Sequence, residues 1–429
     1  MESSKEEEKC VNIVVVGLGQ RGVAYSEYSL DFPLRMKVVG IAEPRDHVRL
    51  SFAEQYEVPS ENCFTDWRDL VLKDKFAEGV IIALQDQLHA DCAVEFAKKG
   101  YHILLEKPMA VTIPDCRRIV ESAIENNVLL SICHVLRYTP WNQKIKDLIE
   151  SGAIGTVANI QHYEPVGYYH FAHSYVRGPW ANEDKSTFSL MAKCCHDIDL
   201  IYWWMNQKCT DISSFGSLFH FKKENQPAEA KDNCLICPLN EKCPYSAKRL
   251  YIDYYKSTGH LPFGYHFEKT DIESVEKALE TGPFGKCAYT SENNVCDNQV
   301  VNMFFQNGST ATLTMSAFTE KVCERQVRIT GSLGEIRNEG AKVSLYLFED
   351  EKETVFNFTE PEEKTRLMGH LGADYYLMKA FIQAIASKKI SLIKTSGEQS
   401  LQSHLLVFAA ELARKEKRVV ETKEFELNS

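Results

Sequence analysis

Long hydrophobic runs are absent from this chain of 429 residues. No stretch of about 18 consecutive apolar residues occurs, so we expect no membrane-spanning helix. Residues 1–9 are charged and acid-rich and lack the apolar core of a secretory signal peptide, which predicts a disordered tail. The 14 cysteines, without such a signal, favour reduced thiols or metal ligands over disulfides. These absences together predict a cytoplasmic protein.

An excess of basic charge is also absent. The chain has 49 basic and 60 acidic residues and a formal net charge of −11, which argues against nucleic acid or an anionic membrane as a partner. Internal repeats are not seen either. The hydrophobic content of 44% and the charged content of 25% are typical of a soluble globular protein, and the length predicts two domains.

A glycine-rich turn follows the first apolar strand. The strand that ends at Val14–Val16 runs directly into Gly17, Gly19 and Gly22, which have the spacing G-x-G-x-x-G. Gly17 is expected to permit a tight turn, Gly19 the approach of a pyrophosphate, and Gly22 the close packing of helix on strand. The N–H groups at the start of the helix favour phosphates. The pattern predicts a dinucleotide site, and the alternative is a structural turn that binds no phosphate.

An acidic residue ends the next strand. Residues 36–42 read as a strand, and Glu43 follows about 20 residues beyond the glycines, where a carboxylate can bind both ribose hydroxyls. The same charge repels a 2′-phosphate, so NAD is favoured over NADP. Arg45 either reverses this preference in part or is a solvated loop cation.

Strand and helix patterns alternate in the first part of the chain. Apolar runs at residues 79–84, 102–105 and 128–132 read as buried strands, whereas residues 48–56 and 89–99 have helical spacing. Strands separated by helices predict a parallel sheet, which binds ligands beyond the carboxyl ends of its strands.

The pattern changes after about Pro140. Alternating runs at residues 300–306 and 310–315 are separated by the hairpin pair Asn307-Gly308, and residues 327–330 and 343–348 continue the strand pattern. These runs predict an antiparallel sheet in a second, α+β domain.

A lysine stands at the end of one of the parallel strands. Glu106-Lys107-Pro108 comes directly after the strand at residues 102–105. A lysine in this place points into the crevice where cofactor and substrate meet, and it can donate to a hydroxyl or carbonyl oxygen while hydride moves at the same carbon. Pro108 is a candidate for a cis peptide bond. The alternative is an ordinary surface lysine.

The order of these motifs resembles the glucose–fructose oxidoreductase, inositol dehydrogenase and rhizopine-catabolism family (Gfo/Idh/MocA). Most of the chain takes part in this resemblance, and Glu-Lys-Pro in this setting is its most specific element. The motifs are Val15-Val16-Gly17-Leu18-Gly19-Gln20-Arg21-Gly22, Ala42-Glu43-Pro44, His89-Ala90-Asp91, Gly100-Tyr101-His102, Glu106-Lys107-Pro108 and Arg137-Tyr138-Thr139-Pro140.

The resemblance implies an α/β fold, with an N-terminal Rossmann parallel sheet and a C-terminal α+β domain that has a large open, mainly antiparallel sheet. It implies a sugar-like polyol or ketone as the small-molecule substrate, Lys107 as the catalytic lysine, and a homo-oligomer formed through the C-terminal sheet. It also places Gln20, Arg21, His89 and Glu106 at the cofactor. The expected parts are a tail over 1–9, a dinucleotide domain over 10–138, a substrate domain over 139–429 and a Cys-rich insertion near 222–260.

A second group of candidate catalytic residues lies on a predicted helix. Lys193, His196 and Asp199 are spaced by three, so each neighbouring pair shares a helix face. His196 titrates near neutrality and can accept a proton while Asp199 steadies its ring. Many relatives have an aspartate where this chain has Ala192; either Lys193 substitutes for it or the reaction differs. The alternative is a structural helix with an incidental histidine.

Further substrate contacts are implied by the resemblance. An arginine can bind hydroxyls or a carboxylate in a fork, and a tryptophan can cover a sugar face. Helix caps and surface residues are the alternative for each position. The candidates are Arg137, Tyr138, His173, Arg177, Trp180, His370 and Asp374.

The cysteine spacing suggests a metal. Cys234, Cys237 and Cys243 form C-x2-C-x5-C, and Cys287 is a plausible fourth ligand. Structural zinc prefers four soft ligands in a tetrahedron. Unliganded thiols or a disulfide are the alternatives.

The leading functional hypothesis is an NAD-dependent oxidoreductase acting on a secondary alcohol or ketone of a sugar, glycoside or cyclitol. Lys107 would polarise the oxygen and His196 would move the proton. A glycosidase that retains NAD and acts by transient oxidation and elimination is the first alternative. A non-enzymatic sugar or dinucleotide sensor is the second, and the presence of Lys107 and His196 argues against it.

Overall fold

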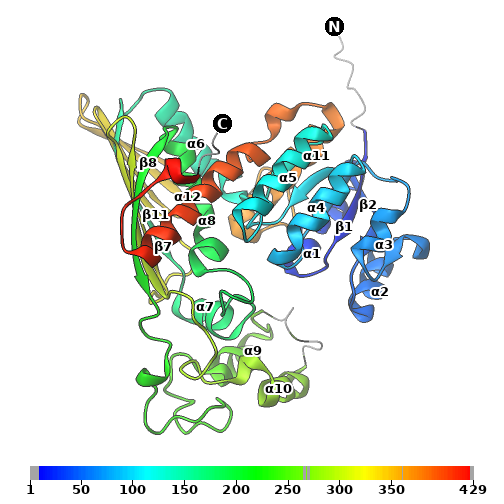
Figure 1. Ribbon diagram of the computed structural model, residues 1–429. Helices are drawn as coiled ribbons and strands as arrows, with labels where there is room; N and C mark the ends of the chain where they lie inside the picture. Colours follow the sequence, from blue (N-terminus) through cyan, green and yellow to red (C-terminus); the bar gives the residue numbers. More distant parts are fainter. Residues whose placement is uncertain (1–8, 264–266, 268–270, 360, 426–429) are drawn as a thin grey trace. The chain divides into compact units, whose positions relative to one another are not determined.

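The chain divides into two compact units in the computed structural model, which describes residues 9–263, 267, 271–359 and 361–425 (Figure 1). Unit 1 consists of Met1–Ser151 and Phe356–Leu405, and unit 2 of Gly152–Val355 and Leu406–Ser429. The predicted boundary at residues 138/139 therefore differs from this division. Part of the difference is helix α11 (Gly369–Ser387), which packs on α1 (Gln20–Asp31) and belongs to unit 1.

Unit 1 is built on a six-stranded parallel sheet of order β3-β2-β1-β4-β5-β6. Strands such as β1 are apolar and almost wholly buried, as expected where helices cover both faces. The order reverses between β1 and β4, which is where parallel sheets bind ligands. The strands are β1 (Val11–Val16), β2 (Met36–Ala42), β3 (Cys63–Phe64), β4 (Gly79–Ile82), β5 (His102–Leu105) and β6 (Leu130–Ile132).

The helices of unit 1 alternate with these strands, as the sequence predicted. They are α1, α2 (Asp46–Gln55), α3 (Trp67–Leu72), α4 (His89–Lys98), α5 (Ile113–Glu125), α6 (Pro140–Glu150) and α11, with short helical turns η1 (Ser60–Asn62), η2 (Asp86–Leu88), η3 (Val135–Tyr138) and η9 (Ile390–Leu392). Helix α12 (Gly397–Glu416) begins in unit 1 and ends in unit 2.

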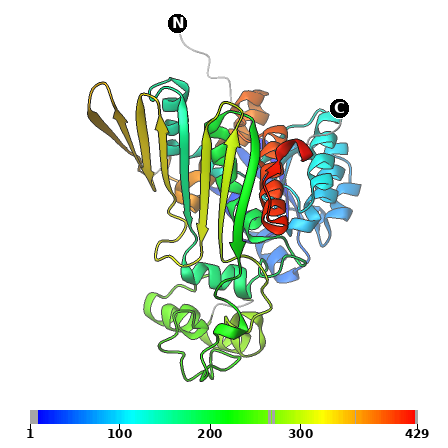
Figure 2. The same ribbon diagram turned by 60° about the vertical axis from the view of Figure 1, so that its left-hand side comes forward.

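Unit 2 contains a nine-stranded sheet of order β14-β13-β12-β11-β7-β10-β9-β8-β15 (Figure 2). Its pairing is mainly antiparallel, with β7 and β10 parallel, and Asn307-Gly308 lies in the turn between β9 and β10 as predicted. The strands are β7 (Val157–Pro165), β8 (Cys209–Ser217), β9 (Asn298–Phe305), β10 (Thr310–Ser316), β11 (Gln326–Gly331), β12 (Gly334–Glu339), β13 (Lys342–Leu347), β14 (Lys352–Asn357) and β15 (Val420–Glu421).

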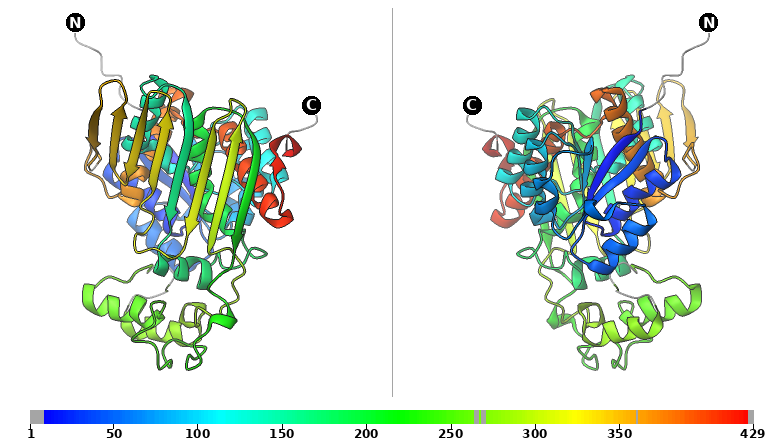
Figure 3. Two further views of the ribbon diagram at one scale, coloured as in Figure 1. Left: turned by 90° about the vertical axis from the view of Figure 1, so that its left-hand side faces the viewer. Right: turned by 90° about the vertical axis from the view of Figure 1, so that its right-hand side faces the viewer.

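Helix α8 (Ser189–Met205) packs against β7 and β10 on one face of this sheet. In Figure 3, left, no described helix of unit 2 covers the opposite face. Helix α8 is buried on most sides, so the charged side chains that it carries must find partners inside the protein. No described helix of the chain is long and apolar enough to cross a membrane.

The predicted Cys-rich insertion is longer than residues 222–260 and occupies the connection between β8 and β9. It has a small hydrophobic core of its own, which includes Tyr251 and Leu279. The remaining helices of unit 2 are α7 (Tyr168–Phe171), η4 (Ala172–Arg177), η5 (Lys223–Asn225), η6 (Lys248–Asp253), α9 (Tyr254–Thr258), α10 (Ile272–Thr281), η8 (Pro283–Gly285) and η10 (Thr422–Phe425).

Candidate active site

The glycine turn after β1 has the geometry that a dinucleotide requires. Gly17 has a φ of +87°, and a Cβ on it would lie 2.4 Å from the carbonyl oxygen of Ala83. A Cβ on Gly22 would lie 2.0 Å from the carbonyl oxygen of Gly17, so helix α1 can approach the strand only with glycine here. A Cβ on Gly19, in contrast, would meet no heavy atom of the described chain within 4 Å. The turn is thus crowded toward the sheet and open at the start of α1, which fits a bound pyrophosphate.

The Glu43 carboxylate lies beside this turn and is already paired. It accepts the backbone N–H of Leu18 at 2.8 Å and Nε of Arg45 at 2.7 Å, and only 3% of the residue is exposed. Burial acts against the charge, but the hydrogen bonds from Arg45 and Leu18 outweigh it and lower the pKa of Glu43. Arg45 is therefore an ion-pair partner of the acid, while its own side chain is 45% exposed, so its effect on the cofactor preference stays a prediction.

Glu106-Lys107-Pro108 lies directly after β5, and the Lys107–Pro108 peptide bond is cis as predicted. The buried Glu106 carboxylate accepts hydrogen bonds from Arg21 Nε at 3.0 Å and from the Tyr25 hydroxyl at 2.6 Å. The backbone N–H of Lys107 donates to its other oxygen at 2.8 Å. Burial opposes the charge, but Arg21 and Lys107 outweigh it and lower the pKa of Glu106. An ionised Glu106 thus fixes the backbone from which the Lys107 side chain starts.

Asp374 extends this network to helix α11. Arg21 donates to both of its carboxylate oxygens, at 2.7 and 2.9 Å, and His370 Nδ1 lies 3.1 Å from Oδ1. Burial opposes ionisation of Asp374, but Arg21 and His370 hold its pKa well below the ordinary value. Unit 1 therefore brings together Arg21, Glu106, His370 and Asp374. Substrate contacts of His370 and Asp374 stay predictions.

Three other candidates of unit 1 have structural partners. His89 is buried, and its Nδ1 lies 2.8 Å from the carbonyl oxygen of Pro108. Arg137, 1% exposed, donates to the carbonyl oxygen of Lys394 at 2.9 Å, and the Tyr138 hydroxyl accepts the N–H of Lys394 at 3.0 Å. These contacts hold the turn after β5 and the residues before α12. Cofactor and substrate contacts of His89, Arg137 and Tyr138 stay predictions.

In unit 2, the predicted catalytic helix is α8. His196 and Asp199 are buried on it, with 4% and 0% of each residue exposed. Lys193 Nζ lies 2.9 Å from Sγ of Cys323 and 3.5 Å from Oε1 of Glu164. Burial acts against the ammonium charge, but Cys323 and Glu164 outweigh it and raise the pKa of Lys193 well above its ordinary value. The Lys193 side chain is consequently protonated and positively charged at neutral pH.

Asp197, on the same helix, belongs to a buried charge network. Its Oδ1 lies 2.7 Å from His162 Nε2 and 2.7 Å from Arg325 Nε, and Arg325 is also 3.2 Å from Glu164. Burial opposes the charge of Asp197, yet Arg325 and His162 hold the pKa of the carboxyl well below its ordinary value. The network ties α8 to β7 and to the chain before β11, so it fixes the helix that carries His196.

The structure places His173 inside the insertion's aromatic core. Its ring is fully buried and stacks on Phe263, with centroids 3.8 Å apart, and on Phe284 at 4.8 Å. Its Nδ1 is hydrogen-bonded to the Tyr251 hydroxyl. These contacts give the ring a packing role, and a substrate contact stays a prediction.

Arg177 and Trp180 differ in their exposure. Arg177 is buried and donates to the carbonyl oxygens of Lys286 at 2.7 Å and Tyr245 at 2.6 Å, whereas Trp180 is partly exposed beside Tyr175. Arg177 thereby joins the segment after α7 to the insertion. A contact of Trp180 with a sugar face stays a prediction.

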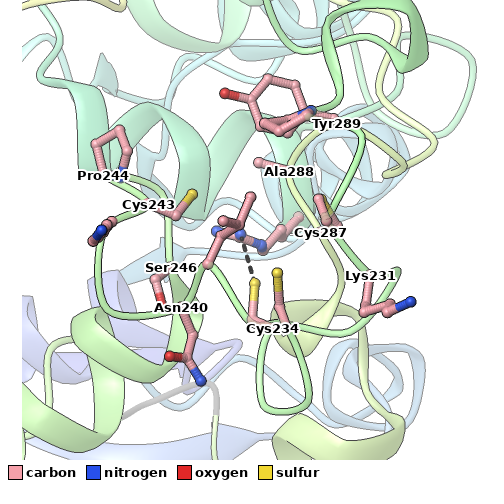
Figure 4. A pocket seen from close by; sticks show the side chains of 15 residues that line it. Lys231, Cys234, Asn240, Cys243, Pro244, Ser246, Cys287, Ala288 and Tyr289 are labelled. Carbon is pink, nitrogen blue, oxygen red and sulfur yellow. Dashed lines mark hydrogen bonds between the residues drawn. The ribbon is translucent and has the colours of Figure 1, made fainter.

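All four candidate metal ligands line one pocket of unit 2: Cys234, Cys237, Cys243 and Cys287 (Figure 4). Within the part of the chain that the structure describes, no group of three or more His, Cys, Asp or Glu side chains is close enough to hold a metal ion as it stands.

Several residues of the site were not identified from the sequence, because they belong to no recognised motif. Tyr25 follows Arg21 by four positions and so shares its helix face. His162 and Glu164 alternate along β7 on its buried side. A pair of polar residues on the buried side of a strand is a usable signal, since such residues need partners. Arg325 leaves no such local pattern, because its partners are distant in sequence.

Comparison with known proteins places the chain in a family. A family model described as an oxidoreductase family with an NAD-binding Rossmann fold (GFO_IDH_MocA) matches residues 11–134, and the model of its C-terminal alpha/beta domain matches residues 146–422. The chain belongs to the Gfo/Idh/MocA oxidoreductase family. It is an oxidoreductase with an NAD-binding fold.

Individual relatives are distant. YteT of Bacillus subtilis, which carries the name of an oxidoreductase, is 24% identical over 387 residues, or 86% of this chain and 87% of YteT. Inositol 2-dehydrogenase of Salmonella typhimurium is 26% identical over 196 residues, or 45% of this chain and 54% of that relative. Among solved structures, a levoglucosan dehydrogenase in complex with NADH and levoglucosan has a TM-score of 0.70 at 16% identity and covers 96% of this chain and 99% of its own. An oxidoreductase domain protein from Kribbella flavida has a TM-score of 0.72 at 17% identity, with 96% and 99% covered. These structures share the fold.

Proposed function

We propose that the protein is an NAD-dependent dehydrogenase that transfers hydride at a secondary alcohol or ketone of a sugar, glycoside or cyclitol. The observation that carries this proposal is the position of Lys107, directly after β5 and held by the paired Glu106, in a chain of this oxidoreductase family. The named relatives support the substrate class, since they include an inositol 2-dehydrogenase and a levoglucosan dehydrogenase.

The proposed roles follow from the charges of the groups. Lys107 donates a hydrogen bond to the oxygen on the reacting carbon, and NAD when bound supplies the hydride acceptor. His196 accepts the hydroxyl proton. Lys193 cannot accept it near neutral pH, because Cys323 and Glu164 raise its pKa. Lys193 instead contributes a fixed positive charge that favours an alkoxide-like oxygen.

We also propose NAD as the cofactor in preference to NADP. Glu43 lies next to the glycine turn and stays ionised. The two ribose hydroxyls of NAD can therefore donate hydrogen bonds to its carboxylate and replace part of the contact with Arg45. The four cysteines expected to bind a structural zinc belong to the insertion of unit 2, and we assign them no part in hydride transfer.

A panel of sugars, glycosides and cyclitols, incubated anaerobically with the protein and NAD, tests the proposed function. Formation of reduced nicotinamide with an equivalent of ketone product is the expected result. Release of aglycone without net reduction would identify the glycosidase alternative. Saturable sugar binding without turnover of any kind would identify a sensor.

A further inference from the structure

The cysteine-lined pocket of the insertion has a volume of about 230 Å³, and among the predicted substrate-contact residues it is lined by Arg177 alone. Four of its lining residues carry thiols: Cys234, Cys237, Cys243 and Cys287. Figure 4 shows the sulfur atoms of Cys234 and Cys243 on different sides of the pocket, with the Cys287 side chain on a third. The remaining lining includes Arg177 but no aspartate or glutamate.

Backbone hydrogen bonds bring these cysteines together from distant positions. Residues Asn233 and Lys286 form an isolated antiparallel bridge. Beside it, the N–H of Cys234 donates to Gly285 at 2.8 Å and that of Cys287 donates to Asp232 at 2.8 Å. The bridge therefore places Cys234 and Cys287 next to each other, although they are 53 positions apart in the sequence.

Cys237 and Cys243 lie in tight turns that follow Cys234 in the sequence. The N–H of Cys237 donates to the carbonyl of Cys234 at 3.4 Å, and the N–H of Cys243 donates to Leu239 at 2.8 Å. A C-x2-C turn of this kind presents two sulfurs on one side of a loop, which is the arrangement that structural zinc sites use. The local backbone is thus organised around the thiols.

Arg177 is the second, independent observation at this pocket. Only 4% of the residue is exposed, and its Nη2 donates to Sγ of Cys234 at 3.5 Å and to Tyr245. Its Nη1 is buried and has no hydrogen-bond partner among the described residues, and no ion pair joins Arg177 to a carboxylate of these residues. A buried, always charged guanidinium without a counter-charge is unfavourable. The pocket is therefore suited to an occupant that carries negative charge.

We propose that this pocket binds one Zn²⁺ ion through the thiolates of Cys234, Cys237, Cys243 and Cys287. Each thiol releases its proton and forms one Zn–S bond, so four protons leave as the metal enters. The product carries two negative charges: four from the thiolates less two from the metal. Arg177 supplies the counter-charge and donates N–H groups to the sulfurs, as outer partners of metal ligands commonly do.

Binding requires the sulfurs to close on the metal. A tetrathiolate zinc site needs Zn–S bonds of about 2.3 Å, whereas in the described structure the thiols line the pocket walls without meeting. Cys237 and Cys243 lie in short-range turns, so closure would require rotation of the side chains and movement of these turns toward Cys234 and Cys287. The empty pocket volume indicates that this closure is sterically possible.

The metal would tie the two ends of the insertion to each other. Its ligands come from both ends of the insertion, and Cys234 also belongs to the small hydrophobic core that contains Tyr251. Tyr251 in turn holds His173. We therefore expect zinc to stabilise the fold of the insertion, since metal binding contributes free energy to folding.

Metal content of the full chain, purified without added chelator from zinc-supplemented medium, is the primary test. We expect about one zinc ion per chain, measured by inductively coupled plasma mass spectrometry. Cys287→Ser and the pair Cys234→Ser, Cys237→Ser are expected to lose it. Cys296→Ser is the matched control, because Cys296 is a buried cysteine of the same unit that does not line the pocket.

A spectroscopic arm keeps the test decisive if the serine variants do not fold. Wild-type protein is stripped with a strong chelator and reconstituted with Co²⁺. Thiolate-to-cobalt charge-transfer absorption, together with intense tetrahedral bands and a rise in the melting temperature, supports the proposal. Retention of full metal by Cys287→Ser would overturn the four-thiol site.

Three further results would also overturn it. One is wild-type protein that binds neither zinc nor cobalt. Another is a disulfide among these cysteines, seen as fewer than 14 titratable thiols in denaturant with chelator present. The third is saturable binding of inorganic phosphate in this pocket without metal, which would assign the Arg177 charge to a free anion.

Discussion

Charged residues around the glycine turn of unit 1 act in pairs and small networks. Glu43 is paired with Arg45, and Glu106 shares Arg21 with Asp374. Each pairing offsets the cost of burying a charge, so removing one member leaves the other uncompensated. Substitutions here therefore test charge placement as much as contact with a ligand.

Replacement of Lys107 by methionine should abolish hydride transfer while NAD still binds. The methionine keeps the length of the apolar stem but cannot donate to the substrate oxygen, and loss of such a group costs about 100-fold or more in kcat/KM. Turnover is measured with a substrate found in the sugar panel, and NAD binding by calorimetry. Lys99→Met, at an exposed position, is the control. Full turnover by a folded Lys107→Met protein would remove Lys107 from the mechanism.

Glu43 should set the cofactor preference. Wild-type protein is expected to bind NAD more tightly than NADP, and Glu43→Gln should weaken NAD binding about 10-fold, since a hydrogen bond to a charged group contributes about 1.5–3 kcal/mol. Titration with both cofactors gives the two dissociation constants, with Glu54→Gln on the neighbouring helix as control. If the wild type bound NADP more tightly, Arg45 rather than Glu43 would govern the pocket.

At the scale of elements, hydrophobic periodicity predicted most helices and strands because each pattern is local. The strand ending at Val16, the hairpin at Asn307-Gly308 and the helix carrying His196 all agree with the structure. The return of Phe356–Leu405 to unit 1 was not predicted, because packing between distant segments leaves no local pattern. For the same reason, burial of Arg177 could not be read from its own neighbours in the sequence.

The ion pair between Asp374 on α11 and Arg21 on α1 should contribute to the free energy of unfolding. Asp374→Asn removes one of the two carboxylates paired with Arg21 while Glu106 stays paired. The loss of unfolding free energy should therefore reach at most the value of about 3–5 kcal/mol that is typical of breaking a buried pair. Denaturant unfolding at neutral pH measures this loss. Asp46→Asn, which removes an exposed partner of Arg49, is expected to change stability by at most about 0.5 kcal/mol.

The same pair gives a pH dependence of known sign. The folded-state pKa of Asp374 is held below the ordinary value of 3.8, so its stabilisation is present above that pH and is lost as the pH falls further toward the folded value. The stability difference between wild type and Asp374→Asn should therefore shrink only below about pH 4. A difference that already disappeared between about pH 7 and about pH 5 would show that another group carries it.

At the scale of the whole molecule, the sheet of unit 2 has one face without a helix in the described structure (Figure 3, left). Phe215 on β8 and Phe304 on β9 lie 64% and 47% exposed, whereas Val301 and Met303 on β9 are buried. Exposed aromatic side chains on a regular strand surface are unfavourable in water and are typical of association surfaces. The expected homo-oligomer through the C-terminal sheet remains a proposal, and this face supports it.

The double variant Phe215→Lys, Phe304→Lys should shift the protein toward the monomer. A self-associating sheet face is self-complementary in a two-fold dimer, so each substitution acts twice, and lysines opposite one another repel. Light scattering during size-exclusion chromatography gives the mass, with 48.9 kDa expected for one chain. Leu34→Lys, which changes an 84% exposed apolar side chain of unit 1, should leave the mass of the assembly unchanged. A wild-type protein that stays monomeric at all concentrations tested, or an assembly unaffected by the double variant, would place any association surface elsewhere than on this sheet.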